Sequence, residues 1–524
     1  MCSRCLLLSL SVMALVVSAQ SPPASGKAGW AIDGGTITLP AGTQSITSPI
    51  AIGSEPGAAG DITVSGQGAA TVLQRGADLP SGQGLINIYG SNIVLKDFVI
   101  DGAVETPAGV PRSALGDPMD DLLSRNTSIW IHPGARRVRL ENITIRHTGG
   151  YAVLLDARDG DITRVEIVRC RFENNRPHLF GPEGDLHYGA WTGGILFKND
   201  GVASTTAVHG LTVRGCSFRR ITGAGVWGHS NGFAAQHTDV KILGNTFRDM
   251  GGDGIEPGNV TGGLVQDNTL YRIGYITTDD DGEGVPKWAF NNPPAVAIDS
   301  TGFVKGVNYV GNTIVNFNGG GIDGDGFHEG LIAANTLWIS PASDPYYRID
   351  NVAAYGPAGK GNSSYGIQPG NTYYGPGGSE IIISNNSIKG VGLWGVSGCN
   401  LKNCVISGNT ITQAPGAIVN PIILYNKPGW DNGVLMDGDN EGADALHRSH
   451  GNLIAGNRID CNPAAFAIAE LNSVNETVHK FKATDVNRAF HNRIGGNCTG
   501  EFQPSPDSGS SAAPALPPGD DASR

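Results

Sequence analysis

The sequence predicts an all-β protein built from stacked coils, and three observations support this fold class. A triplet of asparagine, threonine or serine, and a large apolar residue recurs along the chain, with its asparagines at Asn245, Asn268, Asn312, Asn335, Asn386 and Asn409. The separations 245 to 268, 312 to 335 and 386 to 409 are each 23 residues, a period typical of solenoid repeats. The chain also contains 77 glycines without a Gly-X-Y period, and it lacks any long amphipathic helical pattern.

Each coil follows one plan: an alternating strand, the asparagine turn, a second strand with the threonine and the apolar residue, a glycine turn, and a third strand that begins Gly-Ile or Gly-Val. Three short strands per coil predict a right-handed parallel β-helix with three sheets. Asparagine side chains stacked at the strand spacing of about 4.8 Å can hydrogen-bond to one another as an internal ladder. Asparagine also favours turns for local reasons, so the ladder by itself indicates no function.

The chain divides into four segments. Residues 1–19 have the form of a secretory signal peptide, with Arg4, an apolar run over 5–17 and a small-residue cleavage site at 17–19. A run of about thirteen apolar residues is shorter than the roughly 20 that span a bilayer. A linker over 20–33, the β-helix over 34–500 and a disordered tail over 501–524 follow. We therefore expect a secreted or periplasmic protein that is not held in a membrane.

Six cysteines remain after removal of the signal peptide, and export permits disulfides. Two local pairs are plausible, Cys399 with Cys404 and Cys461 with Cys498. The other two cysteines, at 170 and 216, occupy the asparagine position of the repeat and can stack there as small buried residues. The net charge of −12 argues against a nucleic-acid partner and, more weakly, against a polyanionic glycan.

With these coils and with loops such as Gly251-Gly252-Asp253-Gly254-Ile255, the chain resembles the right-handed parallel β-helix carbohydrate-active enzymes of the pectate-lyase-like superfamily over about residues 34–498. The resemblance implies a polysaccharide substrate. The polygalacturonase motifs Asn-Thr-Asp, Asp-Asp, Gly-His-Gly and Arg-Ile-Lys do not occur in order, and the Asp-Pro-His-Glu motif of alginate epimerases is missing. No catalytic residue is therefore carried over from a particular family.

Three long coils identify the face on which we expect a site. Their extra residues lie between the threonine-bearing strand and the next Gly-Ile or Gly-Val strand, so these insertions should rise on one side of the solenoid. They carry His178, Phe180, His187, Tyr188 and Trp191; Tyr275, Asp279, Asp280, Asp281, Glu283, Lys287, Trp288 and Phe290; and Tyr346, Tyr347, Arg348 and Tyr355. Aromatic rings that stack on pyranoses and polar groups that bind hydroxyls suit an oligosaccharide cleft, although such loops can also simply pack on each other.

The strand after each loop yields the candidate site residues. If its Ile or Val points inward, alternate residues point outward. The outward pairs are Leu196 and Lys198, Trp227 and His229, Glu256 and Gly258, Ala297 and Asp299, Asp323 and Asp325, and Gln368 and Gly370. We predict that Glu256, Asp299, Asp323 and Asp325 are catalytic, and that Lys198, Trp227, His229, Trp288 and Gln368 bind substrate.

Paired carboxylates on neighbouring rungs are the basis of the predicted chemistry. This alignment puts Asp299 and Asp325 one rung apart, where like charges destabilise a sheet unless they share a proton or bind a cation. Glu256 and Asp323 lie two rungs apart, at about 9.6 Å, which favours inversion over the shorter retaining separation. We expect Asp323 or Asp325 to act as general acid and Glu256 or Asp299 to help activate water.

The leading hypothesis is therefore a secreted glycoside hydrolase that needs no cofactor. The first alternative is a polysaccharide lyase or epimerase on a uronate-containing glycan, with Lys198 as the basic residue on the ladder and Ca²⁺ as a possible cofactor. The Asp-rich run over 279–283 has the composition of a calcium loop without EF-hand spacing. The second alternative is a glycan-binding β-helix without catalysis. The sequence sets neither the oligomeric state nor the sugar.

Overall fold

A computed structural model describes residues 32–512 of the chain, with gaps at 34, 54–58, 77–78, 80–83, 104–126, 176–192, 200–203, 230–234, 278–285, 289–294, 318, 341–363, 371–376, 416, 418, 427–429, 432–433, 436–447, 462–464, 472–480, 482–483 and 497. The predicted signal peptide and most of the predicted loop residues lie outside these ranges. Tyr275, Lys287 and Trp288 lie in strands whose side chains are likewise outside the description.

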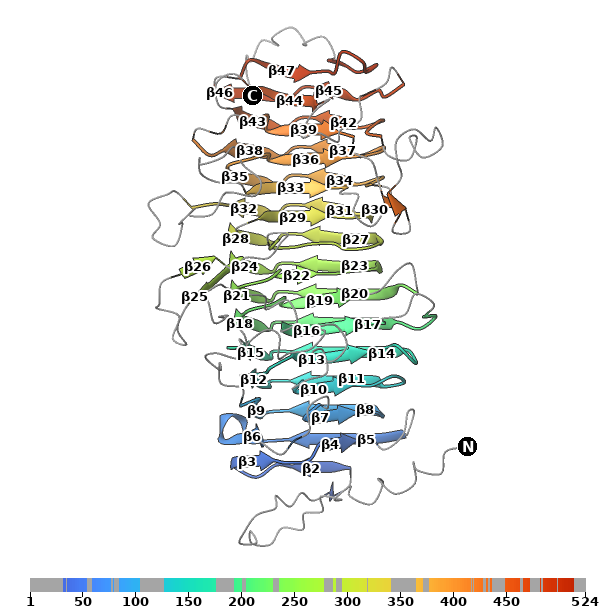
Figure 1. The fold of residues 1–524 in the computed structure, drawn as a ribbon, viewed down its shortest axis with the longest axis vertical. Helices are drawn as coiled ribbons and strands as arrows, with labels where there is room; N and C mark the ends of the chain where they lie inside the picture. Colours follow the sequence, from blue (N-terminus) through green and yellow to red (C-terminus); the bar gives the residue numbers. More distant parts are fainter. Residues whose placement is uncertain are drawn as a thin grey trace, which may run out of the picture.

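The coils stack along one long axis and present three parallel sheets, as predicted (Figure 1). Sheet A contains β1 (Ile32–Asp33), β2 (Thr36–Thr38), β5 (Ala59–Ser65), β8 (Ser91–Lys96), β11 (Arg136–Glu141), β14 (Ile162–Val168), β17 (Val208–Arg214), β20 (His237–Leu243), β23 (Val260–Gln266), β27 (Val304–Val310), β30 (Phe327–His328), β31 (Leu331–Ala333), β34 (Ile382–Ser384), β37 (Val405–Ser407), β42 (Leu453–Ala455), β45 (Arg488–Phe490) and β48 (Ser511–Ala512). Within it, β1 pairs antiparallel with β2.

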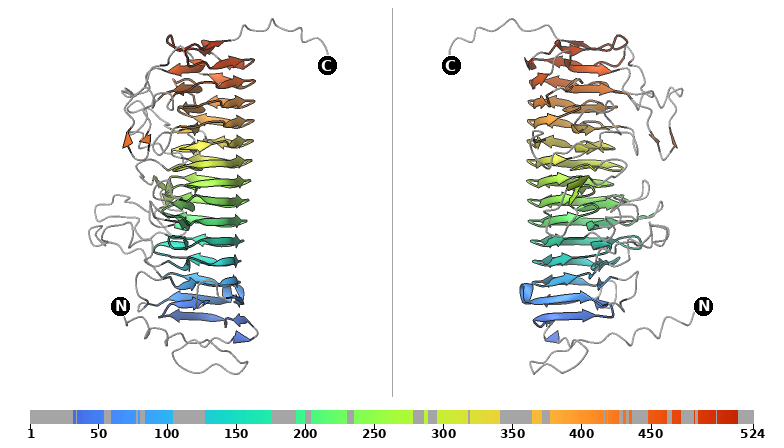
Figure 2. Two further views of the ribbon diagram at one scale, coloured as in Figure 1. Left: turned by 90° about the vertical axis from the view of Figure 1, so that its right-hand side faces the viewer. Right: turned by 60° about the vertical axis from the view of Figure 1, so that its left-hand side comes forward.

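Sheet B follows sheet A in each coil, directly after the asparagine turn. It contains β3 (Gly42–Ile46), β6 (Thr71–Arg75), β9 (Val99–Asp101), β12 (Thr144–Arg146), β15 (Arg171–Glu173), β18 (Ser217–Ile221), β21 (Thr246–Met250), β24 (Thr269–Ile273), β28 (Thr313–Phe317), β32 (Thr336–Trp338), β35 (Ser387–Val391), β38 (Thr410–Gln413), β43 (Arg458–Cys461) and β46 (Arg493–Gly496). Figure 2 shows these rungs from two further sides.

Sheet C completes each coil and consists of two blocks. The first contains β4 (Ile50–Ile52), β7 (Ile86–Ile88), β10 (Ile129–Ile131), β13 (Tyr151–Asp156), β16 (Gly193–Lys198), β19 (Val226–His229) and β22 (Ile255–Glu256). The second contains β29 (Gly320–Gly324), β33 (Tyr365–Pro369), β36 (Val396–Cys399), β39 (Ile422–Tyr425), β44 (Phe466–Leu471) and β47 (Gly500–Gln503). Among the described residues, single bridges from Ile298 to Ile255 and to Ile322 join the two blocks.

The remaining described elements are small. They are the 3₁₀ helix η1 (Gly68–Ala70) and two antiparallel hairpins, β25 (Tyr275–Thr277) with β26 (Pro286–Trp288), and β40 (Trp430–Asp431) with β41 (Val434–Leu435). Across the described ranges, no helix has the length and apolar character needed to cross a membrane.

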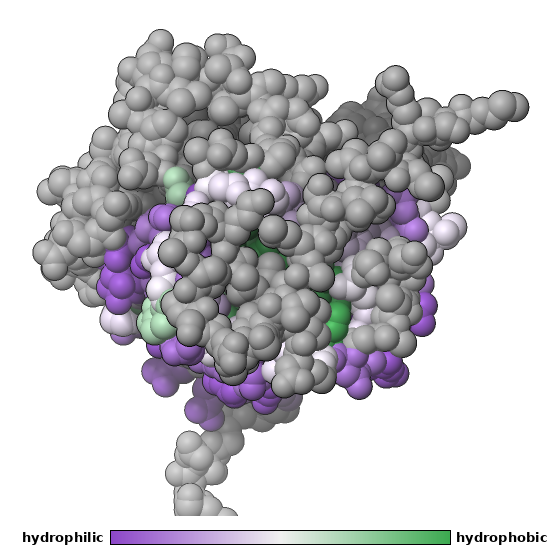
Figure 3. All heavy atoms as spheres, turned by 90° about the horizontal axis from the view of Figure 1, so that it is seen from below, coloured by the Kyte–Doolittle hydropathy of each residue, from purple (hydrophilic) through white to green (hydrophobic). Residues whose placement is uncertain are grey.

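Buried side chains explain the Gly-Ile and Gly-Val starts of sheet C. Phe172, Phe218 and Phe247 of sheet B stack at centroid distances of 4.6 and 4.5 Å inside the solenoid. A Cβ on Gly194 or on Gly225 would lie only 2.6 Å from the ring carbons of Phe218 or Phe247. Glycine at this corner therefore lets the strand approach the core rings. In a view from below, hydrophilic residues lie along the rim of the solenoid and a few hydrophobic residues are visible further in (Figure 3).

The predicted asparagine ladder runs through successive coils. The Nδ2 group of each asparagine donates to Oδ1 of the next at 2.9–3.0 Å, through Asn245, Asn268, Asn312, Asn335, Asn386, Asn409, Asn457 and Asn492. The same Nδ2 groups also donate to a backbone carbonyl, as Asn312 does to Val265 at 2.9 Å. Because each amide satisfies buried donors and acceptors on both sides, the ladder stabilises only one register.

Cysteines continue this ladder toward the N-terminus, as predicted. The backbone amide of Cys216 donates to Asn245 Oδ1 at 2.8 Å, and that of Cys170 donates to Cys216 Sγ at 3.4 Å. Both cysteines are buried and free. Cysteine thiols thus replace the asparagine side chains of the ladder in the coils that contain the stacked rings of Phe172 and Phe218.

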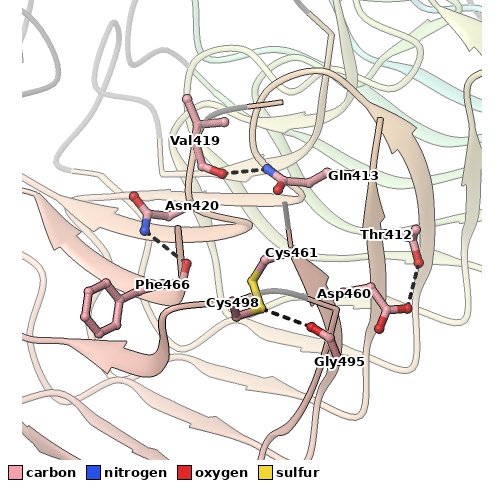
Figure 4. The surroundings of a disulfide bond; sticks show 9 residues. All are labelled: Thr412, Gln413, Val419, Asn420, Asp460, Cys461, Phe466, Gly495 and Cys498. Carbon is pink, nitrogen blue, oxygen red and sulfur yellow. Dashed lines mark hydrogen bonds between the residues drawn. A yellow bond between two sulfur atoms is a disulfide. The ribbon is translucent and has the colours of Figure 1, made fainter. Parts of the chain in front are cut away.

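One of the two predicted local disulfides is confirmed. Cys461 and Cys498 are bonded and join the strands near the C-terminal end (Figure 4). The expected bond between Cys399 and Cys404 is wrong, because neither residue forms a disulfide. Cys404 packs in the main core, whereas Cys399 packs in a separate outer cluster with Ile423 and Tyr425, so the two thiols belong to opposite sides of the wall.

The sequence predicts a disordered tail from residue 501 onward, but ordered strands continue past this point. Strands β47 and β48 extend the solenoid beyond residue 500, and Phe502 is buried. Glu501 accepts hydrogen bonds from Asn492 and ends the ladder, while Glu470 accepts from Ser508 and from the amide of Ser505. The polar composition of this stretch therefore serves to cap the last coil.

Replacing Asn312 by alanine should lower the free energy of unfolding by at least about 1–3 kcal/mol, because the amide partners in Asn268 and Asn335 stay buried without their bonds. Urea denaturation followed by circular dichroism measures this change. The matched control is Thr336→Ala on the exposed face of sheet B, which should have little effect. Equal midpoints for the two variants would contradict the structural role of the ladder.

Candidate active site

The outward face of sheet C brings three predicted catalytic residues into one column. Strand pairing aligns Leu196 with Trp227 and Trp227 with Glu256. The bridges from Ile255 to Ile298 and from Ile298 to Ile322 put Glu256, Asp299 and Asp323 next to one another on successive rungs. Asp323 then aligns with Gln368. The six residues Leu196, Trp227, Glu256, Asp299, Asp323 and Gln368 are called the acid column below.

The predicted pairing of Asp299 with Asp325 is wrong by register. The outward pair Ala297 and Asp299 requires Val296 to point inward, but the backbone amides of Gly254 and Ile255 donate to the carbonyls of Val296 and Ala297. Ala297 therefore occupies the corner that glycine fills in other coils, and Ile298 is the inward residue. Asp299 consequently lies between Glu256 and Asp323. Asp325 is two residues further along its own rung, buried at the edge of the site.

Sequence reasoning missed Asp253, although its position in the repeat identifies it. One oxygen each from Asp253, Glu256 and Asp299 lies within 4.8 Å of the other two. The backbone amide of Val296 donates to Asp253 Oδ1 at 2.6 Å and orients the carboxylate. Asp253 directly precedes the corner glycine Gly254, a position at which the preceding coil has Ala224. The acidic residue at this corner is the sequence feature that could have identified Asp253 as a site residue.

Tyr365, also missed, stands at the same corner on the far side of the acid column. Its hydroxyl donates to Asp323 Oδ2 at 2.8 Å, and the Gln368 amide donates to the same oxygen at 3.3 Å. The aligned residue in the preceding coil is Gly320, where a Cβ would lie 2.5 Å from the Tyr365 ring. Glycine thus leaves room for the tyrosine to lie across the rung and reach Asp323.

Burial and mutual repulsion raise the pKa values of the carboxyls. Burial, then the nearby charge of Asp253, raises the pKa of Glu256 well above its usual range, opposed by hydrogen bonds from Thr301 and Trp227. The pKa of Asp299 is likewise raised well above its usual range by burial and then by Asp323, Asp253 and Glu256. Burial raises the pKa of Asp253 to about 6. The raised pKa values favour protonated carboxyls beside ionisable oxygens, an arrangement suited to acid–base work.

The N-terminal side of the acid column is aromatic. Trp227 lies one rung from Glu256, its ring 4.8 Å from His229 in an edge-on contact and 6.1 Å from Tyr151. Lys198 is buried and aligns with His229 on one side and Asp156 on the other. Of the predicted binding residues, Trp227 and Gln368 belong to the acid column, while Lys198 and His229 lie two residues further along their strands.

Three carboxylates at this separation fit a divalent cation. Calcium binds oxygen at about 2.3–2.6 Å, so ligands on opposite sides of the ion are up to about 5 Å apart. The oxygens of Asp253, Glu256 and Asp299, all within 4.8 Å of one another, meet this limit. The same residues can therefore share protons or hold a cation, depending on the pH and on whether a divalent cation is present.

Comparison with known proteins agrees with this architecture. A family model described as "Right handed beta helix region" matches residues 124–326, which include most of the acid column. The chain is a right-handed parallel β-helix. A search of curated proteins gives no match to this β-helix.

Among solved structures, this β-helix is similar to the mannuronan C-5 epimerase AlgE4 A-module of Azotobacter vinelandii, at 15% identity over 91% of each chain and a TM-score of 0.32. It is also similar to PfbA, a surface adhesin of Streptococcus pneumoniae, at 12% identity over 90% of this chain and 85% of that chain, with a TM-score of 0.44. A third similar structure is the Dettilon tailspike protein, at 14% identity over 89% of this chain and 61% of that chain, with a TM-score of 0.39.

Replacing Asp253 by asparagine should raise the melting temperature of the β-helix at about pH 8 and change it little at about pH 4. The folded-state pKa of about 6 lies above the unfolded value of about 3.9, so the folded state binds more protons between them and loses stability as pH rises through about 6. Asparagine removes this penalty and keeps the bond to Val296.

Thermal melts with a chelator present measure the effect of this substitution. Asp267→Asn is the matched control, because Asp267 is exposed. A destabilised Asp253→Asn variant at about pH 8 would contradict a raised pKa for Asp253.

Proposed function

We propose that this protein is a secreted glycoside hydrolase that cleaves a polysaccharide or oligosaccharide bound along the outward face of sheet C. The stacking of Glu256, Asp299 and Asp323 on three successive rungs carries this proposal. Glycoside hydrolysis needs one protonated and one ionised carboxyl on either side of the scissile bond. A polysaccharide is the partner, and neither a nucleic acid nor a membrane is required.

The burial of Glu256 and the hydrogen bonds to Asp323 support opposite roles for these two outer carboxyls. Glu256, with its raised pKa, is the general acid that protonates the leaving oxygen. Asp323 receives bonds from Tyr365 and Gln368 that favour an ionised carboxylate, and it is the base that activates water. The sequence predicted Asp323 or Asp325 as the acid and Glu256 or Asp299 as part of the base, so the two roles are exchanged here. The hydrogen bond from Tyr365 to Asp323 could not be predicted from the sequence.

Geometry favours an inverting reaction. Glu256 and Asp323 are separated by two rungs, about 9.6 Å between backbones, which leaves room for water beside the sugar. Asp299 lies between them and hydrogen-bonds the attacking water. Trp227, one rung beyond Glu256, supplies an apolar surface for a pyranose ring.

One observation favours a second candidate, a lyase or epimerase acting on a uronate. The oxygens of Asp253, Glu256 and Asp299 fit a calcium ion, which would offset the charge of a uronate carboxylate. Proton abstraction beside that carboxylate then requires a base such as Lys198 or the tyrosine at 365. Burial raises the pKa of Tyr365 well above its usual range, which disfavours the tyrosinate form.

The reaction is tested by incubating the mature protein with neutral and uronic polysaccharides, with calcium or with a chelator. We expect new reducing ends without the ultraviolet absorbance of an unsaturated uronate. Glu256→Gln and Asp323→Asn should each lower kcat about 10²–10⁴-fold, and Asp267→Asn should leave it unchanged. Unsaturated products that depend on calcium would support the lyase instead, and a uronate changed in configuration without cleavage would support the epimerase. Binding without turnover, unaltered in both variants, would leave a glycan-binding protein.

Tyr365→Phe tests the role of Asp323 separately. Loss of the hydroxyl removes a bond that favours the ionised base, so the acidic limb of the kcat/KM profile should move to higher pH while the fold is kept. The measurement is a pH series on wild type and variant with one substrate. A uniform loss of activity at every pH, without a moved limb, would argue against Asp323 as the base.

A further inference from the structure

A second polar column lies around the corner from the acid column, at the start of sheet A. Lys305 pairs with His328, and single bridges continue from His328 to Ser379, from Ser379 to Lys402 and from Lys402 to His450. Only Gly326 and Phe327 separate His328 from Asp325 of the candidate active site. Five adjacent rungs thus present two lysines, two histidines and a serine on one strip, called the basic column here.

Two carboxylates form ion pairs at the two ends of the basic column, and a third, Glu380 beside Ser379, is exposed to solvent. Lys305 Nζ pairs with Glu329 at 2.8 Å. At the other end, Asp485 forms a buried ion pair with Arg448, with bonds of 3.0 and 2.9 Å from Nε. In the described part of the chain no carboxylate pairs with Lys402, which is only partly exposed. A half-buried ammonium without a counterion is costly and attracts an external anion.

The ring nitrogens of His328 give a second indication of a ligand, separate from the charge of Lys402. Its Nδ1 lies 2.9 Å from Ser379 Oγ, and its ring stacks on Phe303 at 5.0 Å. The residue is only 8% exposed, and Nε2 finds no hydrogen-bond partner among the described residues. If the serine hydroxyl donates to Nδ1, the neutral ring carries its proton on Nε2 and offers it to an acceptor. Burial and then the charge of Lys402 lower the pKa of His328 to about 4, so the ammonium lies near the ring. An oxyanion between them would satisfy both this donor and Lys402.

We propose that Lys402, His328 and Ser379 form a binding site for an oxyanion, such as the carboxylate of a uronic acid residue or a free sulfate ion. Lys402 supplies the charge, His328 donates from Nε2, and Ser379 fixes the histidine tautomer. The site is independent of the hydrolytic proposal, because none of its residues belongs to the acid column. A uronate bound there would mark the substrate as an acidic glycan with a group that reaches past the edge of sheet C.

The test is isothermal titration at low ionic strength with three probes: sodium sulfate, a trigalacturonate and a neutral xylotriose. Wild type should bind at least one of the two anions and should bind the neutral sugar more weakly. Lys402→Gln should weaken anion binding at least about tenfold, and His328→Asn should also weaken it. The matched control is Lys389→Gln, which removes the same charge from the exposed face of sheet B and should bind like wild type.

The arms of the titration separate the two sources of the anion. Tighter binding of trigalacturonate than of sulfate assigns the site to a glycan substituent, whereas sulfate binding without preference for the uronate assigns it to a free anion. Absence of binding by both anions would overturn the proposal. Wild-type affinity in Lys402→Gln, or an equal loss in Lys389→Gln, would overturn it too, provided that circular dichroism shows both variants folded.

Discussion

Each coil of this protein is hydrogen-bonded in register to the coils before and after it, and the asparagine ladder fixes that register inside the wall. A shift of one residue would leave buried amides without partners at several levels of the solenoid at once. It would also turn the core residues of each strand to the outside. The position of every outward side chain therefore follows from this one constraint, including those that carry the proposed chemistry.

Register also explains why the site is chemically unusual. Parallel strands hold equivalent positions about 4.8 Å apart, so carboxyls at one position of three successive coils cannot move away from each other. Burial prevents water from screening them, and protons or a cation must relieve the repulsion. The interruption of sheet C at Asp299 falls in the middle of this stretch. Backbone hydrogen bonds still hold these coils together there, from the amide of Asp299 to the carbonyl of Ile255 and from the amide of Asp323 to the carbonyl of Ile298.

Sequence periodicity predicted the fold because the asparagine, the apolar residue after it and the corner glycine each have a separate physical role. The same periodicity predicted that Glu256, Asp299 and Asp323 share a face. It failed where a coil departs from the pattern: Ala297 replaces the corner glycine, and counting from Val296 moved Asp299 out of its column. Asp253 and Tyr365 were not predicted because they precede the corner glycine of their coils, where strand alternation no longer predicts the direction of a side chain.

The start of the predicted tail and the expected bond between Cys399 and Cys404 were wrong for physical reasons that composition and spacing do not reveal. Residues 501–512 lack large apolar side chains except Phe502, yet they pair with the last coils because Glu470 and Glu501 complete buried hydrogen bonds. Composition alone does not reveal such capping. Likewise, the separation between Cys399 and Cys404 in sequence is short, but the wall of the solenoid lies between their side chains.

We expect the stacked carboxyls to hold protons at neutral pH because the register forces them together. Carbon-13 NMR of protein labelled at the side-chain carboxyls of aspartate and glutamate, titrated with a chelator present and assigned with Glu256→Gln and Asp299→Asn, measures this directly. The resonances of Glu256 and Asp299 should titrate well above the range of ordinary carboxyls, and removal of one carboxyl should change the titration of the other. Independent titration of both groups near their unperturbed values of about 4 would contradict it.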